Sequence, residues 1–168
     1  MGISKEGKET NKLFCQITGF TEPPGNHPQG DAWDIVNGQT IAWAEIKKDT
    51  YNQVRPYKYN TLVGYDTEEK QWYVIPPDVV ISSFCYDKKG QHTTDPVEVL
   101  NLSKVSSKKF KDYKVSVENL RDAVIKAHLQ GEKNLLVKEY AEKRREEYEN
   151  TPSIRKKEIQ LLKEKINA

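Results

Sequence analysis

Residues 30–48 read GDAWDIVNGQTIAWAEIKK, and this stretch decides the fold that we expect for the chain. Two apolar segments, residues 32–36 and 40–47, have the composition of β-strands. The dipeptide Asn37-Gly38 between them is the strongest short hairpin signal that a sequence can carry. The stretch therefore predicts a β-hairpin.

The second strand of this hairpin ends in Glu45-Ile46-Lys47, where charged side chains follow an apolar run. Side chains alternate between the two faces of a strand, so Glu45 and Lys47 share one face. A buried carboxylate or ammonium costs several kcal/mol unless it is paired or binds a metal ion. The position therefore indicates either a buried ion pair or a functional site, and we favour the functional site.

Asp34, on the first strand, is the acidic residue that we expect to join Glu45. A two-residue turn at Asn37-Gly38 places Asp34 opposite Ile41 and on the same face as Glu45. That register leaves the two acids roughly 13 Å apart along the strands. We therefore expect a longer turn or a bulge that brings Asp34 towards Glu45 without changing its face.

Two converging carboxylates with a lysine beside them suit the hydrolysis of a phosphodiester. Mg²⁺ prefers hard oxygen ligands, keeps several waters and takes only one or two protein carboxylates together with phosphate oxygens of the substrate. Asp34 and Glu45 are the expected carboxylate ligands, and the backbone carbonyl of Ile46 is a further one. Lys47 is expected to hold or help deprotonate the attacking water and to offset charge on the phosphate. We therefore expect Mg²⁺ as the cofactor, with Mn²⁺ as a substitute.

This pattern resembles the PD-(D/E)xK nucleases, which include type II restriction endonucleases and archaeal Holliday-junction resolvases. Asp34, the hairpin and the Glu-Ile-Lys tripeptide carry the resemblance, which covers roughly residues 4–75. Proline usually precedes the first aspartate of the family motif, whereas Trp33 stands here. The resemblance implies an α/β, restriction-endonuclease-like core with a mixed β-sheet flanked by helices, and magnesium-dependent cleavage of DNA.

The resemblance also implies an acidic residue on the helix before the hairpin, facing the metal. The helix expected over residues 4–18 offers Glu9, which we place on its inward side, with Glu6 as the alternative. A plain surface glutamate near a helix N-terminus, where the helix dipole favours it, is the competing interpretation. Asp31 is equally open, because it either assists a second metal ion or caps the turn before the hairpin.

Basic and aromatic residues are interleaved in the segment 51–60, directly downstream of Lys47. In some PD-(D/E)xK nucleases, a glutamine and a tyrosine in this element orient the catalytic lysine and contact DNA, and basic residues there can pair with phosphates. A polar loop with packed tyrosines is the alternative interpretation. The residues that we expect to contact DNA are Gln53, Arg55, Tyr57 and Lys58.

The rest of the chain alternates helices and strands, which predicts a mixed α/β arrangement around one sheet. Residues 72–75 and 97–102 are strand candidates, and residues 78–84 are a helix candidate. Residues 1–115 are expected to form the nuclease core. Residues 116–168 have a helical pattern and are expected to form a C-terminal extension that packs on the core or on a partner.

The composition sets limits on the class of protein. With 168 residues, the chain has room for one compact core and an appendage. A net charge of +2 permits DNA binding but does not argue for it. No apolar run approaches the roughly 18 to 20 residues that span a bilayer, and the first residues lack a secretory signal, so we expect no membrane association and a cytoplasmic location. Cys15 and Cys85 lie in apolar surroundings and are expected to be reduced core residues.

Three functions remain open from the sequence. A restriction-type endonuclease, which we favour, needs side chains that reach base edges, whereas a structure-specific junction or repair nuclease needs mainly phosphate contacts. One domain of this size holds one active site and a double-strand break needs two cuts, so we expect a homodimer. The third function is a catalytically silent DNA-binding or assembly module.

Overall fold

The computed structural model describes residues 5–24, 30–36, 38, 40–54, 60–83, 85–87, 97–150 and 153–168. The larger of its two sheets has the strand order β1 (Ala32–Val36), β2 (Thr40–Lys48), β4 (Thr61–Asp66), β5 (Gln71–Ile75), β8 (Lys114–Val115). The smaller sheet has the order β3 (Tyr51–Val54), β7 (Val97–Leu102), β6 (Cys85–Asp87). In the larger sheet β2 pairs in parallel with β4, whereas the other neighbours are antiparallel. The predicted α/β class with a mixed sheet flanked by helices is therefore confirmed.

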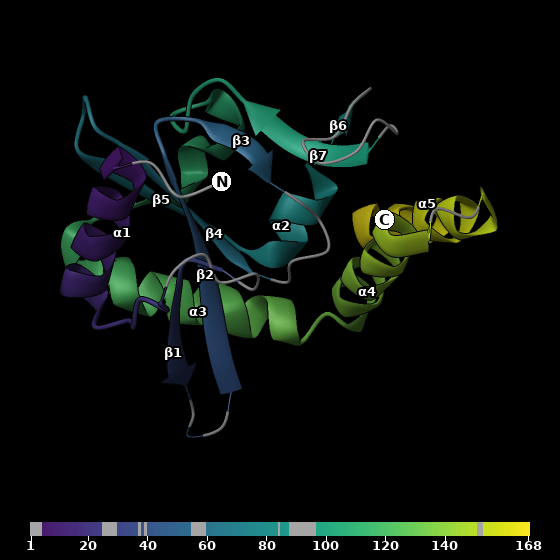
Figure 1. Ribbon diagram of the computed structural model, residues 1–168, viewed down its shortest axis with the longest axis horizontal. Helices are drawn as coiled ribbons and strands as arrows, with labels where there is room; N and C mark the ends of the chain where they lie inside the picture. The colour runs from purple at the N-terminus through teal and green to yellow at the C-terminus, as the bar shows by residue number, and fades with distance from the viewer. Residues whose placement is uncertain are drawn as a thin grey trace.

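The helices lie on both sides of the larger sheet (Figure 1). The α-helices are α1 (Lys5–Thr18), α2 (Pro77–Ser82), α3 (Leu120–Glu132), α4 (Leu135–Asn150) and α5 (Ser153–Asn167), and the 3-10 helices are η1 (Lys108–Tyr113) and η2 (Val117–Asn119). α1 lies beside one end of α3, and α4 and α5 lie at the other end (Figure 1). The chain is thus layered, with the larger sheet in the middle.

Two hydrophobic clusters cover the two faces of the larger sheet. The α1/α3 cluster joins Phe14 of α1 and Leu120 of α3 to alternate residues of β2, such as Ala42 and Ala44. The second cluster, which we call the small-sheet cluster, contains the buried residues Tyr51, Val54, Leu62, Tyr73, Ile75, Val80, Ile81, Leu100, Val105, Phe110, Tyr140, Ile159 and Leu162. Burial of both faces gives the central strands little alternation of polar and apolar residues.

The clusters show which way the side chains of β2 point. Ile46 is in register with Val63 of β4, and both belong to the α1/α3 cluster. Glu45 is in register with Leu62, which belongs to the small-sheet cluster. Glu45 and Lys47 therefore share the face of the small-sheet cluster, because residues two apart on a strand point the same way.

The C-terminal helices pack on the rest of the chain. Leu120 and Val124 of α3 are fully buried in the α1/α3 cluster, and Tyr140 of α4 and Ile159 of α5 are buried in the small-sheet cluster. The helical character predicted for this region is confirmed. The division of the chain into a core and an extension stays a prediction, because α3 supplies part of one core layer.

Cys15 on α1 is a free, half-buried thiol, as the sequence predicts. Burial, with smaller contributions from the carboxylates of Glu22 and Asp31, raises the pKa of this thiol to about 11. The thiol is therefore protonated at neutral pH. Cys85 lies in β6, and its side chain is outside the described residues.

In the part of the chain that the structure describes, no helix combines the length with the apolar composition that crossing a bilayer requires.

Candidate functional site

The predicted site lies where β2 runs past the end of β1. The last registered pair of the hairpin joins Ala32 to Ala44, so residues 45–48 of β2 have β4 on one side and lie beyond β1 on the other. Directly before β1, the chain bends at Asp31. The end of β2 therefore presents a strand edge that β1 does not cover.

Asp31 binds this edge through its backbone and its side chain. Its N–H donates a hydrogen bond to the carbonyl of Ala44 (3.0 Å), and its Oδ2 atom accepts one from the N–H of Ile46 (2.8 Å). The N–H and C=O of one strand residue point to the same neighbouring strand, so the carbonyl of Ile46 also points to this edge. The carboxylate of Asp31 and the carbonyl of Ile46 are thus neighbours at the edge of β2.

Gly30 explains how the chain brings Asp31 so close to β2. A Cβ atom at this position would lie 2.8 Å from Nδ2 of Asn60 and 3.2 Å from the carbonyl oxygen of Ala44. A side chain here would crowd both atoms, so glycine favours this close approach of the two backbones. In the sequence, the glycine directly before Asp31 was the feature that could have indicated this close approach to β2.

Glu45 and Lys47 form an ion pair at the same end of β2. Nζ of Lys47 lies 3.8 Å from Oε1 of Glu45, and the two side chains are 25% and 12% exposed, respectively. The prediction that these residues share a face is confirmed. Because neither side chain is sealed in the core, both can meet a ligand that approaches from solvent.

Tyr51 lies beside Lys47 on this face. Gly64 of β4 is the registered neighbour of Lys47, and a Cβ atom at Gly64 would lie within 3 Å of the ring and hydroxyl of Tyr51. Tyr51 is fully buried, and its hydroxyl has no hydrogen-bond partner among the described residues. Burial raises the pKa of Tyr51 well above its usual range, so the hydroxyl stays protonated beside the Lys47 side chain.

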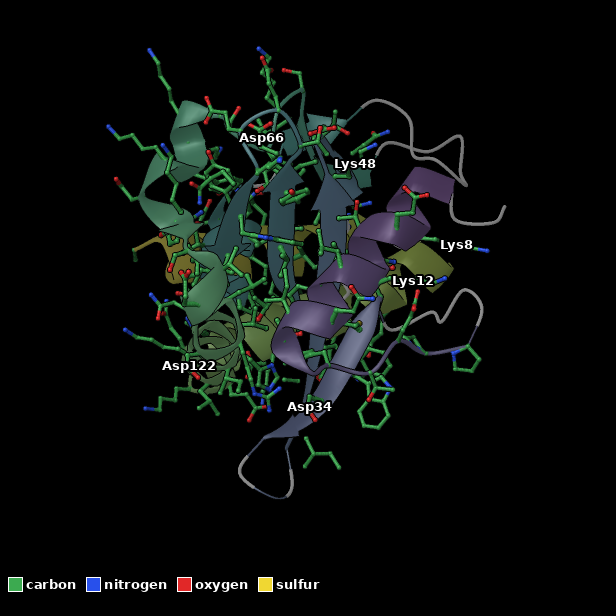
Figure 2. The ribbon with its side chains drawn as sticks, turned by 90° about the vertical axis from the view of Figure 1, so that its left-hand side faces the viewer. Lys8, Lys12, Asp34, Lys48, Asp66 and Asp122 are labelled. Carbon is green, nitrogen blue, oxygen red and sulfur yellow. The ribbon has the colours of Figure 1, made fainter. Side chains whose placement is uncertain are left out.

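Asp34 lies apart from Glu45. It pairs with Ala42, one position away from the predicted register, and such a shift moves a side chain to the opposite face. Asp34 therefore faces the α1/α3 cluster, and roughly 10 Å of strand separate Ala42 from Glu45. Figure 2 shows Asp34 near the tip of the hairpin and Lys48 at the other end of the sheet. The expected convergence of Asp34 with Glu45 is therefore wrong, because the longer turn that we expected turns Asp34 to the other face instead of keeping its face.

Arg121 of α3 is the partner of Asp34. Its Nη2 atom lies 2.7 Å from Oδ2 of Asp34, and its Nη1 atom donates a hydrogen bond to the carbonyl of Thr18 (2.6 Å). The guanidinium also lies 5.6 Å above the ring centre of Phe20. Asp34 thus helps to tie the hairpin to the end of α1 and to α3, which is a structural role.

The acid predicted on α1 is not directed into the sheet. The inward side of α1 carries Thr10, Asn11 and Phe14, all of them buried, whereas Glu9 is exposed. Placing Glu9 on the inward side of the helix is therefore wrong. The side chain of Glu6, the alternative, lies outside the described residues.

The residues predicted to contact DNA fall in and after β3. Gln53 is part of this strand, and its side chain is outside the described residues, as are Arg55, Tyr57 and Lys58 altogether. Their contacts with DNA stay predictions.

The end of β2 offers oxygen donors of the kind that a hard divalent cation prefers. They are the carboxylates of Asp31 and Glu45 and the carbonyl of Ile46. Among the described residues, no group of three or more His, Cys, Asp or Glu side chains is placed to hold a metal ion. Mg²⁺ does not need such a group, since it takes one or two carboxylates and keeps its waters, whereas a structural Zn²⁺ site needs four protein ligands. The donor set therefore suits Mg²⁺.

A surface pocket opens at the end of β2, and Ile46 and Lys47 are among its lining residues, whereas Asp31 and Glu45 are not. Its volume is about 340 Å³, and it is lined by Gly7 of α1, residues 46–50 and Asn52. This is roughly the volume that ten water molecules occupy in the liquid, so a phosphate group fits. Lys47 and Lys48 are among the lining residues, which gives the pocket a positive charge near its wall.

Comparison with known proteins adds little to this geometry. No protein family model matches the chain, and no curated protein matches it. Among solved structures, the chain is similar to the bacterial homing endonuclease I-Ssp6803I, with a TM-score of 0.41 and 18% sequence identity. The match covers 80% of this chain and 100% of that chain. We draw no functional conclusion from a likeness at this level.

Proposed function

We propose that the chain is a magnesium-dependent DNA endonuclease whose active site lies at the end of β2. The observation that supports this proposal is the Glu45–Lys47 ion pair at the end of β2, where Asp31 accepts a hydrogen bond from the N–H of Ile46. A pocket large enough for a phosphate is lined there by Ile46 and Lys47. Buried or half-buried charges of this kind are rarely kept for stability alone, because apolar residues are often no worse there.

Each of these residues has a defined task in the reaction. Asp31 and Glu45 would hold Mg²⁺ through their carboxylates, with the carbonyl of Ile46 as a further ligand. Bound there, the ion would offset charge on the phosphate and make the attacking water more acidic. The ammonium of Lys47 donates hydrogen bonds to that water or to a phosphate oxygen and offsets the negative charge that develops. Asp34 takes no part in these steps and acts on the fold through Arg121.

A plasmid-nicking assay tests this function. Supercoiled plasmid is expected to become open-circular and then linear with Mg²⁺ or Mn²⁺, and to stay intact with EDTA. Lys47→Ala is expected to slow cutting by about 10-fold or more, because it removes a charge that stabilises the transition state. Lys126→Ala, on α3 and away from the pocket, is the matched control and is expected to cut like the wild type.

A wild-type protein that binds the plasmid but cuts it with neither metal contradicts the proposal and favours the non-catalytic DNA-binding module. Equal cutting by Lys47→Ala and the wild type contradicts the role of this lysine.

Within endonucleases, we favour a sequence-specific, restriction-type enzyme that acts as a homodimer, because the described residues of one chain offer one such site and a double-strand break needs two cuts. Sequencing the ends of a digested long DNA is expected to find one recurring sequence at the cuts. Preferred cutting of a four-way junction, with random ends on linear DNA, supports the structure-specific alternative. Light scattering during gel filtration measures the oligomeric state.

A further inference from the structure

The outer side of α1 carries two lysines beside the pocket. Gly7 lines the pocket, and the next residue, Lys8, is exposed, as is Lys12 one turn further along the helix. Four residues of an α-helix span about 6 Å along its axis, which is close to the spacing of neighbouring phosphates on one DNA strand. Lys8 and Lys12 therefore form a line that starts beside the pocket, and their spacing along the helix suits contacts with successive phosphates.

Lys48 extends this line at the end of β2. It lines the pocket, and its place in the strand directs it to the α1 side of the sheet, as alternation from Ile46 requires. Figure 2 shows Lys8, Lys12 and Lys48 on the same side of the molecule. Among the ion pairs of the described residues, none involves any of these three lysines.

Nearby acids reduce this positive charge only in part. Asp49 also lines the pocket and keeps its negative charge, because the groups that donate hydrogen bonds to it, the N–H and the hydroxyl of Thr67 at 2.8 to 3.0 Å, are neutral. Glu9 is exposed on α1 and is the acid nearest in sequence to Lys8. The three lysines outnumber these two acids, so the named groups together carry a net positive charge.

We propose that Lys8, Lys12 and Lys48 form a phosphate-binding track for the backbone of a duplex DNA strand that enters the pocket at Lys47. This inference rests on the proposed function and names the path of the DNA. Proteins that bind single strands stack bases on exposed aromatic rings. The proposed track consists of lysines, which pair with phosphates and offer the bases no ring to stack on, and this favours the backbone of duplex DNA.

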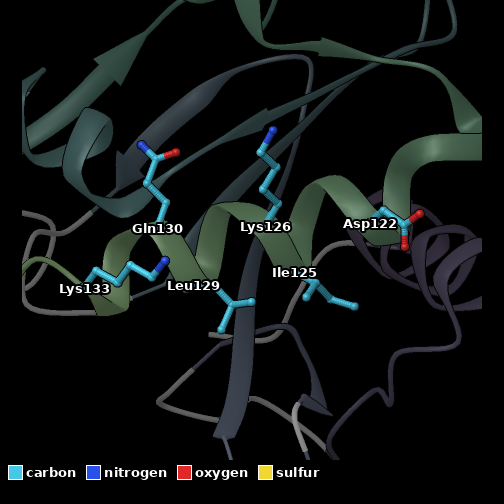
Figure 3. Close-up of a pocket in the computed structure, with 6 residues that line it drawn as sticks. All are labelled: Asp122, Ile125, Lys126, Leu129, Gln130 and Lys133. Atoms are coloured by element: carbon cyan, nitrogen blue, oxygen red, sulfur yellow. The ribbon is translucent and has the colours of Figure 1, made fainter.

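Exposed lysines on α3 and at the edge strand β8 provide a charge-matched control. A second pocket, of about 470 Å³, lies along α3 and is lined by residues that include Lys126 and Lys133 (Figure 3). Asp122 lines the same pocket and reduces its positive charge. Lys114 at the edge strand β8 is also exposed. Replacing these three lysines by glutamine changes the net charge as much as replacing those of the track.

The test measures binding of a fluorescent DNA duplex by anisotropy at several salt concentrations, with EDTA present so that no cleavage occurs. The triple variant Lys8→Gln/Lys12→Gln/Lys48→Gln is expected to bind at least 10-fold more weakly at low salt. Its plot of log affinity against log salt is expected to be flatter by about 1 for each lysine that contacts a phosphate. The triple variant Lys114→Gln/Lys126→Gln/Lys133→Gln is expected to keep the slope of the wild type.

The phosphate track is overturned if the track variant binds duplex DNA like the wild type, if both triple variants lose equal affinity, or if the wild type binds no DNA. Tighter binding of a single strand than of a duplex overturns the choice of duplex DNA. These outcomes are separate from the failure of the proposed function. If the wild type cuts DNA and the track variant binds DNA as tightly as the wild type, only the phosphate track is contradicted. If the track variant binds more weakly but the wild type never cuts DNA, only the nuclease function is contradicted.

Discussion

Asp31→Asn is expected to abolish metal-dependent cutting of DNA, with a loss on the order of 10²-fold or more. Asparagine has the same shape as aspartate, and its carbonyl can still accept the hydrogen bond from the N–H of Ile46. The substitution therefore keeps the bend that holds the strand edge and removes the charge that binds Mg²⁺. Initial rates of plasmid cutting, measured at saturating Mg²⁺, give the size of the loss.

Asp34→Asn is the matched control for Asp31→Asn, and it is expected to affect stability instead of chemistry. It weakens a partly exposed ion pair with Arg121, which costs about 1 kcal/mol of unfolding free energy after solvent screening. Arg121→Gln is expected to cost a similar amount, and the double variant less than the sum, because both remove one interaction. A normal cutting rate for Asp31→Asn together with a lost rate for Asp34→Asn contradicts the site described here.

Gly64→Ala is expected to lower the unfolding free energy by about 3 kcal/mol, the upper end of what overpacking a core costs. The added Cβ atom would lie 2.2 Å from the hydroxyl oxygen of Tyr51 and 2.8 Å from its Cζ atom. The ring of Tyr51 cannot easily move, because it is fully buried and packs edge-on against Phe110, with ring centres 5.5 Å apart. Urea unfolding followed by circular dichroism measures the change.

The double variant Tyr51→Phe/Gly64→Ala tests whether the clash with the Tyr51 hydroxyl causes this loss of stability. Removing the hydroxyl takes away the nearest clashing atom and leaves the ring carbons, so the double variant is expected to recover part of the stability that Gly64→Ala loses. A Gly64→Ala protein as stable as the wild type, or no recovery in the double variant, shows that Tyr51 does not fill the space above Gly64.

Local signals in the sequence were enough to find the hairpin. The apolar runs predict strands at residues 32–36 and 40–47, and the structure has them at Ala32–Val36 and Thr40–Lys48. The register of the hairpin needed more than local signals. Val36 pairs with Thr40, so the connection holds three residues instead of two, and the one extra residue turns Asp34 to the other face.

The strand that completes the site left a weak signal in the sequence. β4 (Thr61–Asp66) is buried on both faces along most of its length, so it lacks the alternation that marks a half-buried strand. Its Gly64 also suggests an interruption when only the sequence is read. The need for glycine there becomes visible only when Tyr51, from the smaller sheet, packs over it. This part of the site depends on packing between residues that are far apart in the sequence, so a short stretch of sequence could not predict it.

Soaking crystals with Mn²⁺ and measuring its anomalous scattering tests the central claim most directly. We expect one peak within coordination distance of a carboxylate oxygen of Asp31, a carboxylate oxygen of Glu45 and the carbonyl oxygen of Ile46. A peak bound to Asp34, or no peak at the end of β2 at millimolar Mn²⁺, contradicts the account.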